Sequence, residues 1–520
     1  MRRGIPYELG VGVIQNGDVS HGTPGRLAAA ASVLSRTWLL AAVLAACILR
    51  LWIAPLPSSF WVDEMATVFV VQHGAADPSF QAAPQVPASL YYVLPRLANS
   101  VFGVSEAGYR LPSVLLMLGA LLAIARLAQR LIHPDAGWFA ALACFLLREF
   151  NYQAADARPY ALGTCMACAS LLFLVRWLDS GRWLDSLGFV AFGTLVWRAH
   201  LLFWPIYVVF AVYTLVRLLR GQSKAGWLQA GAVYAALGVS LLPVLREAWE
   251  LSRQAGAHVV AGIPSGGDFA RALKLGFVVP FCAVSALLGR WFRWPLVDRP
   301  ASVESVTLIL ALWLCDPSCL FLLSRVSGDS VFLSRYLYLA LPGIALTGTL
   351  AAAVFLPRTF WRPMAAVLGI GILIFAGRWN HLAPDHHNSN WRAASRAINR
   401  EVGGADVPIL CPSPFIEARP PVWRPNYPAS SFLYSHLAVY PIRGTVYRFP
   451  FETSPQAEQF AAALSQATLS TSKEFIIYGG DRAARFWRDW FSARPELAGW
   501  RTRELGAFGD VEALVFERPS

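Results

Sequence analysis

The feature that most constrains the fold of this chain is a succession of apolar stretches, each close to the length of a membrane span. An α-helix needs about twenty mainly apolar residues to cross the hydrocarbon core of a bilayer. The whole sequence agrees, since 56% of its residues are hydrophobic, 15% are charged, and its mean hydropathy is +0.46. We therefore expect an α-helical polytopic membrane protein with about eleven transmembrane helices, at 37–57, 111–131, 136–153, 160–178, 184–200, 201–219, 226–246, 270–290, 303–323, 336–356 and 363–378.

The formal net charge of +12 comes mostly from dispersed arginines, which argues against nucleic acid as a partner. Basic residues concentrate instead in the loops that would be cytoplasmic if the N-terminus is cytoplasmic, as the positive-inside rule requires. This topology places Asp63, Arg158 and Arg335 on the outer face. The basic residues of the inner loops are Arg126, Arg130, Arg176, Arg182, Arg217, Arg220, Lys224, Arg290, Arg293, Arg358 and Arg362.

Composition divides the chain into three parts. We expect a cytoplasmic tail at 1–36, a transmembrane part at 37–378 with a long external loop at 58–108, and a small extracytoplasmic α/β domain at 379–520. In the last part, short apolar runs predict strands at 407–411, 474–478 and 511–516, alternating with helices at 391–402, 455–466 and 481–492.

The external loop contains an apolar piece, 89–102, that is too short to span a bilayer. We expect a helix that lies in the membrane interface, with Tyr91 and Tyr92 in the belt of aromatic residues found at that depth.

Two adjacent carboxylates, Asp63 and Glu64, follow the first apolar stretch. Ionisable groups at a bilayer boundary are costly unless they have a partner or a task, so the pair is a candidate for chemistry. Neighbouring side chains diverge on a helix or a strand, so both can hardly face one reacting atom. One is expected to act as a catalytic base while the other orients a loop, caps a helix or binds a cation. The alternative is that both merely cap the interface helix or pair with an arginine.

Two arginines stand at the predicted starts of spans on the same outer face. Arg158 is followed by Tyr160 and Arg335 by Tyr336. A guanidinium held there suits phosphate oxygens, although snorkelling toward lipid headgroups explains most interfacial arginines. His386 and His387 suggest a metal site, but no spaced carboxylate or cysteine completes one, and a solvated turn is the favoured interpretation.

An ordered set of short motifs over roughly residues 37–400 resembles the GT-C superfamily of membrane glycosyltransferases. The similarity is to its protein mannosyltransferase-like group, glycosyltransferase family 39 and bacterial relatives that include lipid A aminoarabinose transferases. The motifs are Trp61-Val62-Asp63-Glu64-Met65-Ala66-Thr67, Pro87-Ala88-Ser89-Leu90-Tyr91-Tyr92, Phe102-Gly103, Tyr109-Arg110-Leu111-Pro112-Ser113, Ala157-Arg158-Pro159-Tyr160-Ala161-Leu162, Ser334-Arg335-Tyr336 through Leu341-Pro342, and Asn390-Trp391-Arg392.

This resemblance implies an inverting enzyme that takes a sugar from a polyprenyl-phosphate carrier at the outer face of a cell membrane, with a bacterial inner membrane expected. Asp63 would be the base, Glu64 a secondary acidic group, and Arg158 and Arg335 the site for the donor phosphate. The substrate cavity would include Tyr91, Tyr92, Asp156, Tyr160 and Tyr336. No metal ligands are assigned, and a divalent cation is left open as a cofactor. A lipid, a polysaccharide or a protein hydroxyl is the expected acceptor.

Two other classes of protein were weighed against a transferase. A transporter or lipid flippase often shows internal repeats and charges at the bilayer midplane, whereas this chain has no convincing repeat and its acidic pair lies at a boundary. A non-catalytic scaffold, whose outer domain binds a partner, is disfavoured by the presence of Asp63, Arg158 and Arg335 together.

Overall fold

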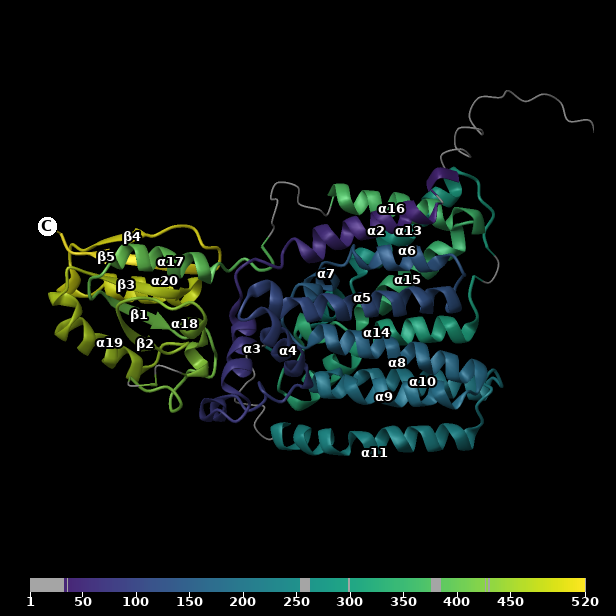
Figure 1. Cartoon of the computed structure of the whole chain (residues 1–520), viewed down its shortest axis with the longest axis horizontal. Helices are drawn as coiled ribbons and strands as arrows, with labels where there is room; N and C mark the ends of the chain where they lie inside the picture. Colours follow the sequence, from purple (N-terminus) through teal and green to yellow (C-terminus); the bar gives the residue numbers. More distant parts are fainter. Residues whose placement is uncertain are drawn as a thin grey trace, which may run out of the picture.

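The computed structural model describes residues 32–34, 36–252, 262–297, 300–375, 385–425, 427–428 and 431–519. Nearly all of the predicted tail at 1–36 lies outside these residues, as do the end of the predicted span 363–378 and the expected boundary between 378 and 379. Figure 1 shows a bundle of helices with an α/β unit at one end, beside α3 (Val62–His73) and α4 (Val93–Phe102).

Every one of the predicted apolar stretches contains helix. By length and composition, six helices could cross a membrane, or up to seven if the bent pair α12 and α13 counts as one span, so eleven spans stays a prediction. The helices of the bundle are α2 (Thr37–Ile48) with the π-helical turn η1 (Leu49–Ile53), α5 (Glu106–Leu131), α6 (Ala136–Cys144), α7 (Arg148–Ala154), α8 (Tyr160–Ser180), α9 (Trp183–Ala199), η4 (Leu201–Phe203), α10 (Pro205–Leu219), α11 (Trp227–Ser252), α12 (Gly266–Ala272), α13 (Leu275–Trp291), α14 (Val303–Ser327), η6 (Ser334–Leu337), α15 (Ala340–Phe355), η7 (Arg358–Phe360) and α16 (Trp361–Phe375).

The stretch predicted as one span at 136–153 is instead two helices, α6 and α7, which corrects that prediction. The chain tightens into i→i+3 hydrogen bonds at Phe145 and Leu147, and the side-chain amide of Asn151 donates to the carbonyl of Phe145 over 2.8 Å. The indole of Trp52 donates to Asn151 in turn, over 3.0 Å. These side chains satisfy backbone groups that the break would otherwise leave unpaired. The break makes α7 a separate short helix.

Ion pairs join the predicted inner loops to one another at one end of the bundle. Asp179 at the end of α8 accepts from Arg130 of α5 and Arg217 of α10, over 3.2 and 2.8 Å. Arg220 pairs with Glu304, the first-turn acid of α14. The loops that the sequence groups on one membrane face are therefore grouped in space.

The predicted interface helix is present as a 3-10 turn, η3 (Leu90–Tyr92), followed by α4. Leu97, Val101 and Phe102 of α4 are exposed apolar side chains, as expected of such a helix. Tyr91 and Tyr92, however, are buried, so the prediction that these two side chains belong to an aromatic belt was wrong. The Tyr91 hydroxyl lies 3.0 Å from the Ser113 hydroxyl inside the bundle, which gives the buried phenol a polar partner.

The α/β unit, here called the C-terminal unit (residues 391–517), contains a five-stranded sheet in the order β2-β1-β3-β5-β4. Strand β1 is parallel to β2 and β3, whereas β5 is antiparallel to β3 and β4. Its elements are α17 (Trp391–Val402), β1 (Pro408–Pro412), η8 (Phe432–Tyr434), α18 (Ser435–Val439), β2 (Thr445–Phe449), α19 (Pro455–Ala467), η9 (Leu469–Thr471), β3 (Glu474–Gly480), α20 (Asp481–Ser492), η10 (Pro495–Leu497), β4 (Arg501–Glu504) and β5 (Val511–Glu517).

The three buried strands and three helices predicted for this region coincide with β1, β3, β5, α17, α19 and α20. The sequence analysis missed β2 and β4, which form the two edges of the sheet. All four residues of β4 are exposed and none is apolar, so this strand carries no alternating pattern from which it could be recognised.

The C-terminal unit is fixed to the bundle by polar and aromatic contacts. The Tyr440 hydroxyl accepts from the backbone amide of Phe60 and donates to Glu106, each over 2.9 Å. Arg392 pairs with the same Glu106 over 2.9 Å. Phe432 packs its ring against Phe80, with 5.1 Å between the centroids. These contacts hold the unit against the loop that precedes α3 and against the start of α5.

Gly343 of α15 lies where this helix packs closely against α14, so a substitution at Gly343 tests that packing. A Cβ atom at this position would lie 2.4 Å from the backbone nitrogen of Trp313, so the two helices would have to separate. We expect Gly343→Ala to destabilise the protein by about 1–3 kcal/mol, as overpacking does. Thermal unfolding in detergent, followed by tryptophan fluorescence, measures it. Gly371→Ala on α16 is the matched control, because nothing lies within 4 Å of its Cβ position. Equal melting temperatures for the two variants would contradict this account of the packing.

Candidate active site

The acidic pair predicted from the sequence lies in the first turn of α3. Trp61 precedes the helix in an extended conformation, and its backbone amide donates to the Glu64 carboxylate over 3.3 Å. Acidic side chains suit this position because the first turn of a helix presents unpaired amides and a partial positive charge. On the helix, Asp63 and Glu64 point in different directions and have different partners.

Glu64 forms a fully buried ion pair with Arg110 of α5. The guanidinium Nε donates to Glu64 Oε1 over 2.7 Å and Nη2 to Oε2 over 2.5 Å, a bidentate arrangement. The same guanidinium donates to the carbonyls of Leu56, Ser58 and Ser59, over 2.8, 2.7 and 3.0 Å. Glu64 also accepts from the amide of Ala157 over 2.8 Å. The pair therefore fixes the chain that leads into α3.

These contacts change the interpretation of Glu64. Its carboxylate is committed to Arg110 and two backbone amides. The contacts favour for Glu64 the part expected of the residue beside the base, which is to orient a loop. They include the pairing with an arginine that was weighed as the alternative, and the assignment of Glu64 as a secondary acidic group stays a prediction.

Asp63 meets both of the predicted arginines, although they lie far away in the sequence. Asp63 Oδ2 is 3.1 Å from Arg335 Nη1, and Arg158 Nη1 donates to the Asp63 backbone carbonyl over 3.0 Å. The Nε atoms of Arg158 and Arg335 are buried and have no hydrogen-bond partner among the described residues. The predicted convergence of the three residues is thus observed, and both guanidinium groups keep donor capacity for a ligand.

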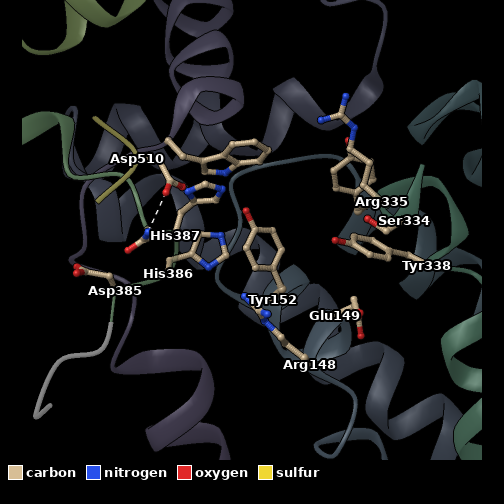
Figure 2. Close-up of a pocket in the computed structure, with 13 residues that line it drawn as sticks. Arg148, Glu149, Tyr152, Ser334, Arg335, Tyr338, Asp385, His386, His387 and Asp510 are labelled. Carbon is tan, nitrogen blue, oxygen red and sulfur yellow. Dashed lines mark hydrogen bonds between the residues drawn. The ribbon is translucent and has the colours of Figure 1, made fainter. Parts of the chain in front are cut away.

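A cavity of about 630 Å³ opens beside this cluster, between the bundle and the C-terminal unit (Figure 2). Such a volume is typical of small-molecule sites. The bundle side contributes Trp61, three residues of α7, namely Arg148, Glu149 and Tyr152, and also Tyr160, Ser334, Arg335 and Tyr338. The other side consists of Asp385, His386, His387, Asn388 and Asp510.

Of the nine residues predicted for the site, Tyr160 and Arg335 line this cavity. Tyr91 and Tyr92 are buried behind it, and Tyr336 packs its ring against His200, with 5.1 Å between centroids. Asp156 is buried too, and accepts from the Trp61 indole over 3.0 Å, so it supports a lining residue from behind.

The solvated turn predicted for His386 and His387 is wrong. The His386 side chain is 3% exposed and packs against Tyr152, with 4.1 Å between ring centroids. His387 stacks on Trp61 at 4.9 Å with the rings parallel. Burial lowers the pKa of His386 to about 3, so its imidazole is neutral. The burial of the two histidines could not be predicted locally, because these contacts bring together segments that are distant along the chain.

The α7 residues of the cavity were missed for a different reason, although a signal existed. The charged pair Arg148 and Glu149 interrupts the apolar stretch 136–153, and a charged pair inside a predicted span marks either a break or a site. The observed break exposes both to the cavity, where Glu149 pairs with Lys274.

One group of side chains has the composition of a metal site. Ligand atoms of Glu64, Asp156 and His386 lie within 4.8 Å of one another. Glu64 is already neutralised by Arg110, and that guanidinium would repel a divalent cation at this point. The donor set therefore does not fit a cation. We interpret these side chains as structural, since Asp156 accepts from the Trp61 indole and His386 packs against Tyr152.

The Glu64–Arg110 pair yields a prediction about stability. Glu64→Gln leaves a buried guanidinium without its counter-charge, which costs about 3–5 kcal/mol. We expect a large drop in melting temperature and loss of the folded protein in detergent extracts. Glu106→Gln is the control, since Glu106 binds Arg392 at a more exposed position. Wild-type stability of Glu64→Gln would show that the pair does not hold the loop.

Asp156 yields a prediction about pH. Burial raises the pKa of its carboxyl to about 7, against the opposing effects of the Trp61 hydrogen bond and the Arg158 charge. The folded protein therefore keeps this proton up to about pH 7, whereas the unfolded chain loses it near pH 4. The contribution of the protonated Asp156 carboxyl to the free energy of unfolding is therefore complete below about pH 4 and is lost as the pH rises toward 7.

Asp156→Asn imitates the protonated carboxyl. The melting temperature of the variant, measured from pH 5 to pH 8, should fall less with rising pH than that of the wild type. Parallel curves for the two proteins would rule out a proton on Asp156 in the folded state.

Known proteins share the fold of this chain and part of its sequence pattern. Residues 86–244 match the family described as dolichyl-phosphate-mannose-protein mannosyltransferase. The fold is similar to ArnT from Cupriavidus metallidurans bound to undecaprenyl phosphate, with a TM-score of 0.51 and 11% identity over 95% of this chain and 98% of that one. For ArnT in the apo state the TM-score is 0.51, with 12% identity over 92% and 98% of the two chains. The comparison with curated proteins finds no match.

At this level of identity the structural likeness establishes the fold, and the family match covers part of the bundle. Together with the apolar helices, they show a multi-pass membrane protein. The chain thus combines a region that matches the dolichyl-phosphate-mannose-protein mannosyltransferase family, residues 86–244, with a fold similar to that of ArnT.

Proposed function

We propose that this protein is an inverting glycosyltransferase that moves a sugar from a polyprenyl-phosphate carrier to an acceptor hydroxyl at the outer face of the membrane. The observation that carries the proposal is the contact of Asp63 with Arg158 and with Arg335, the latter of which lines the cavity. A carboxylate beside two guanidinium groups is what such a reaction requires. The family match and the likeness to a protein solved with undecaprenyl phosphate support the same donor class.

In this mechanism Asp63 takes the proton of the acceptor hydroxyl as its oxygen attacks the anomeric carbon. The bond between that carbon and the phosphate oxygen breaks on the opposite face, which inverts the configuration. The departing polyprenyl phosphate gains negative charge, and Arg335 and Arg158 are placed to stabilise it. Each preorganised donor of this kind contributes about 3–4 kcal/mol to lowering the barrier.

The Asp63–Arg335 pair gives each residue a function before substrate binds. The ion pair with Arg335 holds the Asp63 carboxylate in a defined position. When the donor phosphate arrives, it competes with Asp63 for the guanidinium. The carboxylate is then released toward the acceptor hydroxyl. The Asp63 and Arg335 side chains are 22% and 37% exposed, which leaves room for this exchange.

Snorkelling to lipid headgroups does not describe these arginines well. Arg158 is directed at a backbone carbonyl inside the protein, and Arg335 at a carboxylate. The transporter alternative would place ionisable groups within the spans. Asp316 in α14 is a buried carboxylate of this kind, but it forms no ion pair among the described residues. The paired charges lie instead at the end of the bundle that faces the C-terminal unit, which favours a transferase.

Asp63→Asn tests the base directly. Transfer from labelled undecaprenyl-phosphate sugars, assayed in membranes that contain the native acceptor, should fall by about 10²–10⁴-fold. Binding of undecaprenyl phosphate should persist, because the phosphate site is intact. Arg335→Gln should instead raise the donor concentration needed for half-maximal rate.

The control for both variants is Asp329→Asn, a substitution of the same kind at a partly buried position six residues before Arg335. Full transfer activity in Asp63→Asn would refute the assignment of the base. An unchanged donor dependence in Arg335→Gln would mean that this arginine does not bind the phosphate.

A further inference from the structure

The cavity has two chemically different ends. Figure 2 shows Ser334, Arg335 and Tyr338 on one side and Asp385, His387 and Asp510 on the other, with Tyr152 between them. The first end is basic and is the phosphate end of the proposed function. The second end is acidic and aromatic, and the C-terminal unit and the segment before it supply most of it.

We propose that this second end is a subsite for a sugar ring, recognised by Asp385, Asn388 and Asp510. The inference rests on the proposed function and adds the residues that would choose the sugar. Two sources could bring a ring there: the sugar carried by the donor, or a glycan acceptor.

We call Asp385, Asn388 and Asp510 the acidic wall of the cavity, and hydrogen bonds hold two of these residues in place. The Asn388 side-chain amide donates to Asp510 Oδ1 over 2.8 Å, and the Asp510 backbone amide donates to the Asn388 carbonyl over 2.6 Å. Asn390 and Phe508 add a further backbone hydrogen bond of 3.0 Å. Gly509 allows this approach, since it has a φ of +70° and any Cβ would lie 1.9 Å from the Asn388 carbonyl oxygen. The segment at 388–390 is therefore joined to the loop before β5.

The chemistry of this wall suits a polyhydroxyl ligand. Carboxylate and amide oxygens accept hydrogen bonds from sugar hydroxyls, and the Asn388 amide can donate in return. Asp385 and Asp510 would repel a phosphate, so the two ends of the cavity separate the anionic and the neutral portions of a glycolipid. A neutral or amino-substituted sugar fits better than an anionic one.

An aromatic surface lies beside these groups. The Trp61 indole is held by its hydrogen bond to Asp156 and by its stack on His387, so it presents a fixed edge of the cavity. Flat apolar rings of this kind complement the C–H faces of a sugar. Trp61 lies two residues before Asp63, so a ring bound here would be close to the proposed base.

Binding measurements can separate the two sources of the ring. The probes are undecaprenyl phosphate, a panel of undecaprenyl-phosphate-linked hexoses and pentoses, and the corresponding methyl glycosides. We expect at least one sugar-bearing probe to bind to the purified full-length protein. For that probe, Asp510→Asn and Asp385→Asn should each weaken binding by about tenfold, roughly the loss of one hydrogen bond to a charged group.

If the donor brings the ring, the variants should lose only the preference for the glycosylated carrier over undecaprenyl phosphate. If the acceptor brings it, methyl glycosides should bind to the protein saturated with undecaprenyl phosphate, and the variants should weaken that binding. Asp489→Asn on α20 is the control, because this aspartate is 70% exposed and does not line the cavity. Asp385→Asn, at an exposed position, guards against a folding defect in Asp510→Asn.

The inference fails if both variants bind every sugar-bearing probe as the wild type does, or if no sugar adds to or competes with undecaprenyl phosphate binding. Failure of the proposed function is a separate result, namely no binding of undecaprenyl phosphate by the wild type.

Discussion

The buried ion pair between Glu64 and Arg110 is the interaction on which the candidate site depends. It satisfies the carbonyls of the chain between the first helix and α3, fixes the start of α3, and receives the amide of Ala157. The loop that carries Arg158 and the helix that carries Asp63 are thereby joined at one carboxylate. A buried pair of this kind is expensive to desolvate and more expensive to break. Its value here is positional, since it sets the distance between the carboxylate of Asp63 and the guanidinium of Arg158, to which we assign the same substrate.

The cavity is a property of the junction between two parts of the molecule. The bundle alone supplies a basic and aromatic surface through α7, η6 and the start of α8. The opposite wall comes from residues 385–388 and the loop before β5, and Tyr440 and Arg392 hold the C-terminal unit against the bundle. The unit therefore contributes directly to the candidate site, which is consistent with a part in selecting what is transferred or what receives it.

The sequence predicted that Asp63, Arg158 and Arg335 lie together because the topology expected from it places all three at one membrane face. Counting spans assigns each loop to a membrane face, and three charged landmarks on one face must lie within a limited area. It also predicted the buried strands β1, β3 and β5, since an apolar run is visible without its neighbours. It could not reveal β4, whose exposed polar residues take their conformation from pairing with β5.

What the sequence by itself determined is the class of the molecule: apolar stretches require a membrane, and loop charges indicate which landmarks share a face. Only the tertiary structure decided which partner each carboxylate of the acidic pair has. Asp63 and Glu64 are adjacent and chemically alike, but α3 directs one toward Arg335 and the other into the bundle against Arg110. The same holds for His386, whose burial depends on Tyr152 and Asp156 from a distant segment. The hydrophobicity of a segment depends only on its own residues, so a membrane helix can be predicted from a short stretch of sequence. The partner of a polar side chain depends on which segments pack together, and only the tertiary structure shows that.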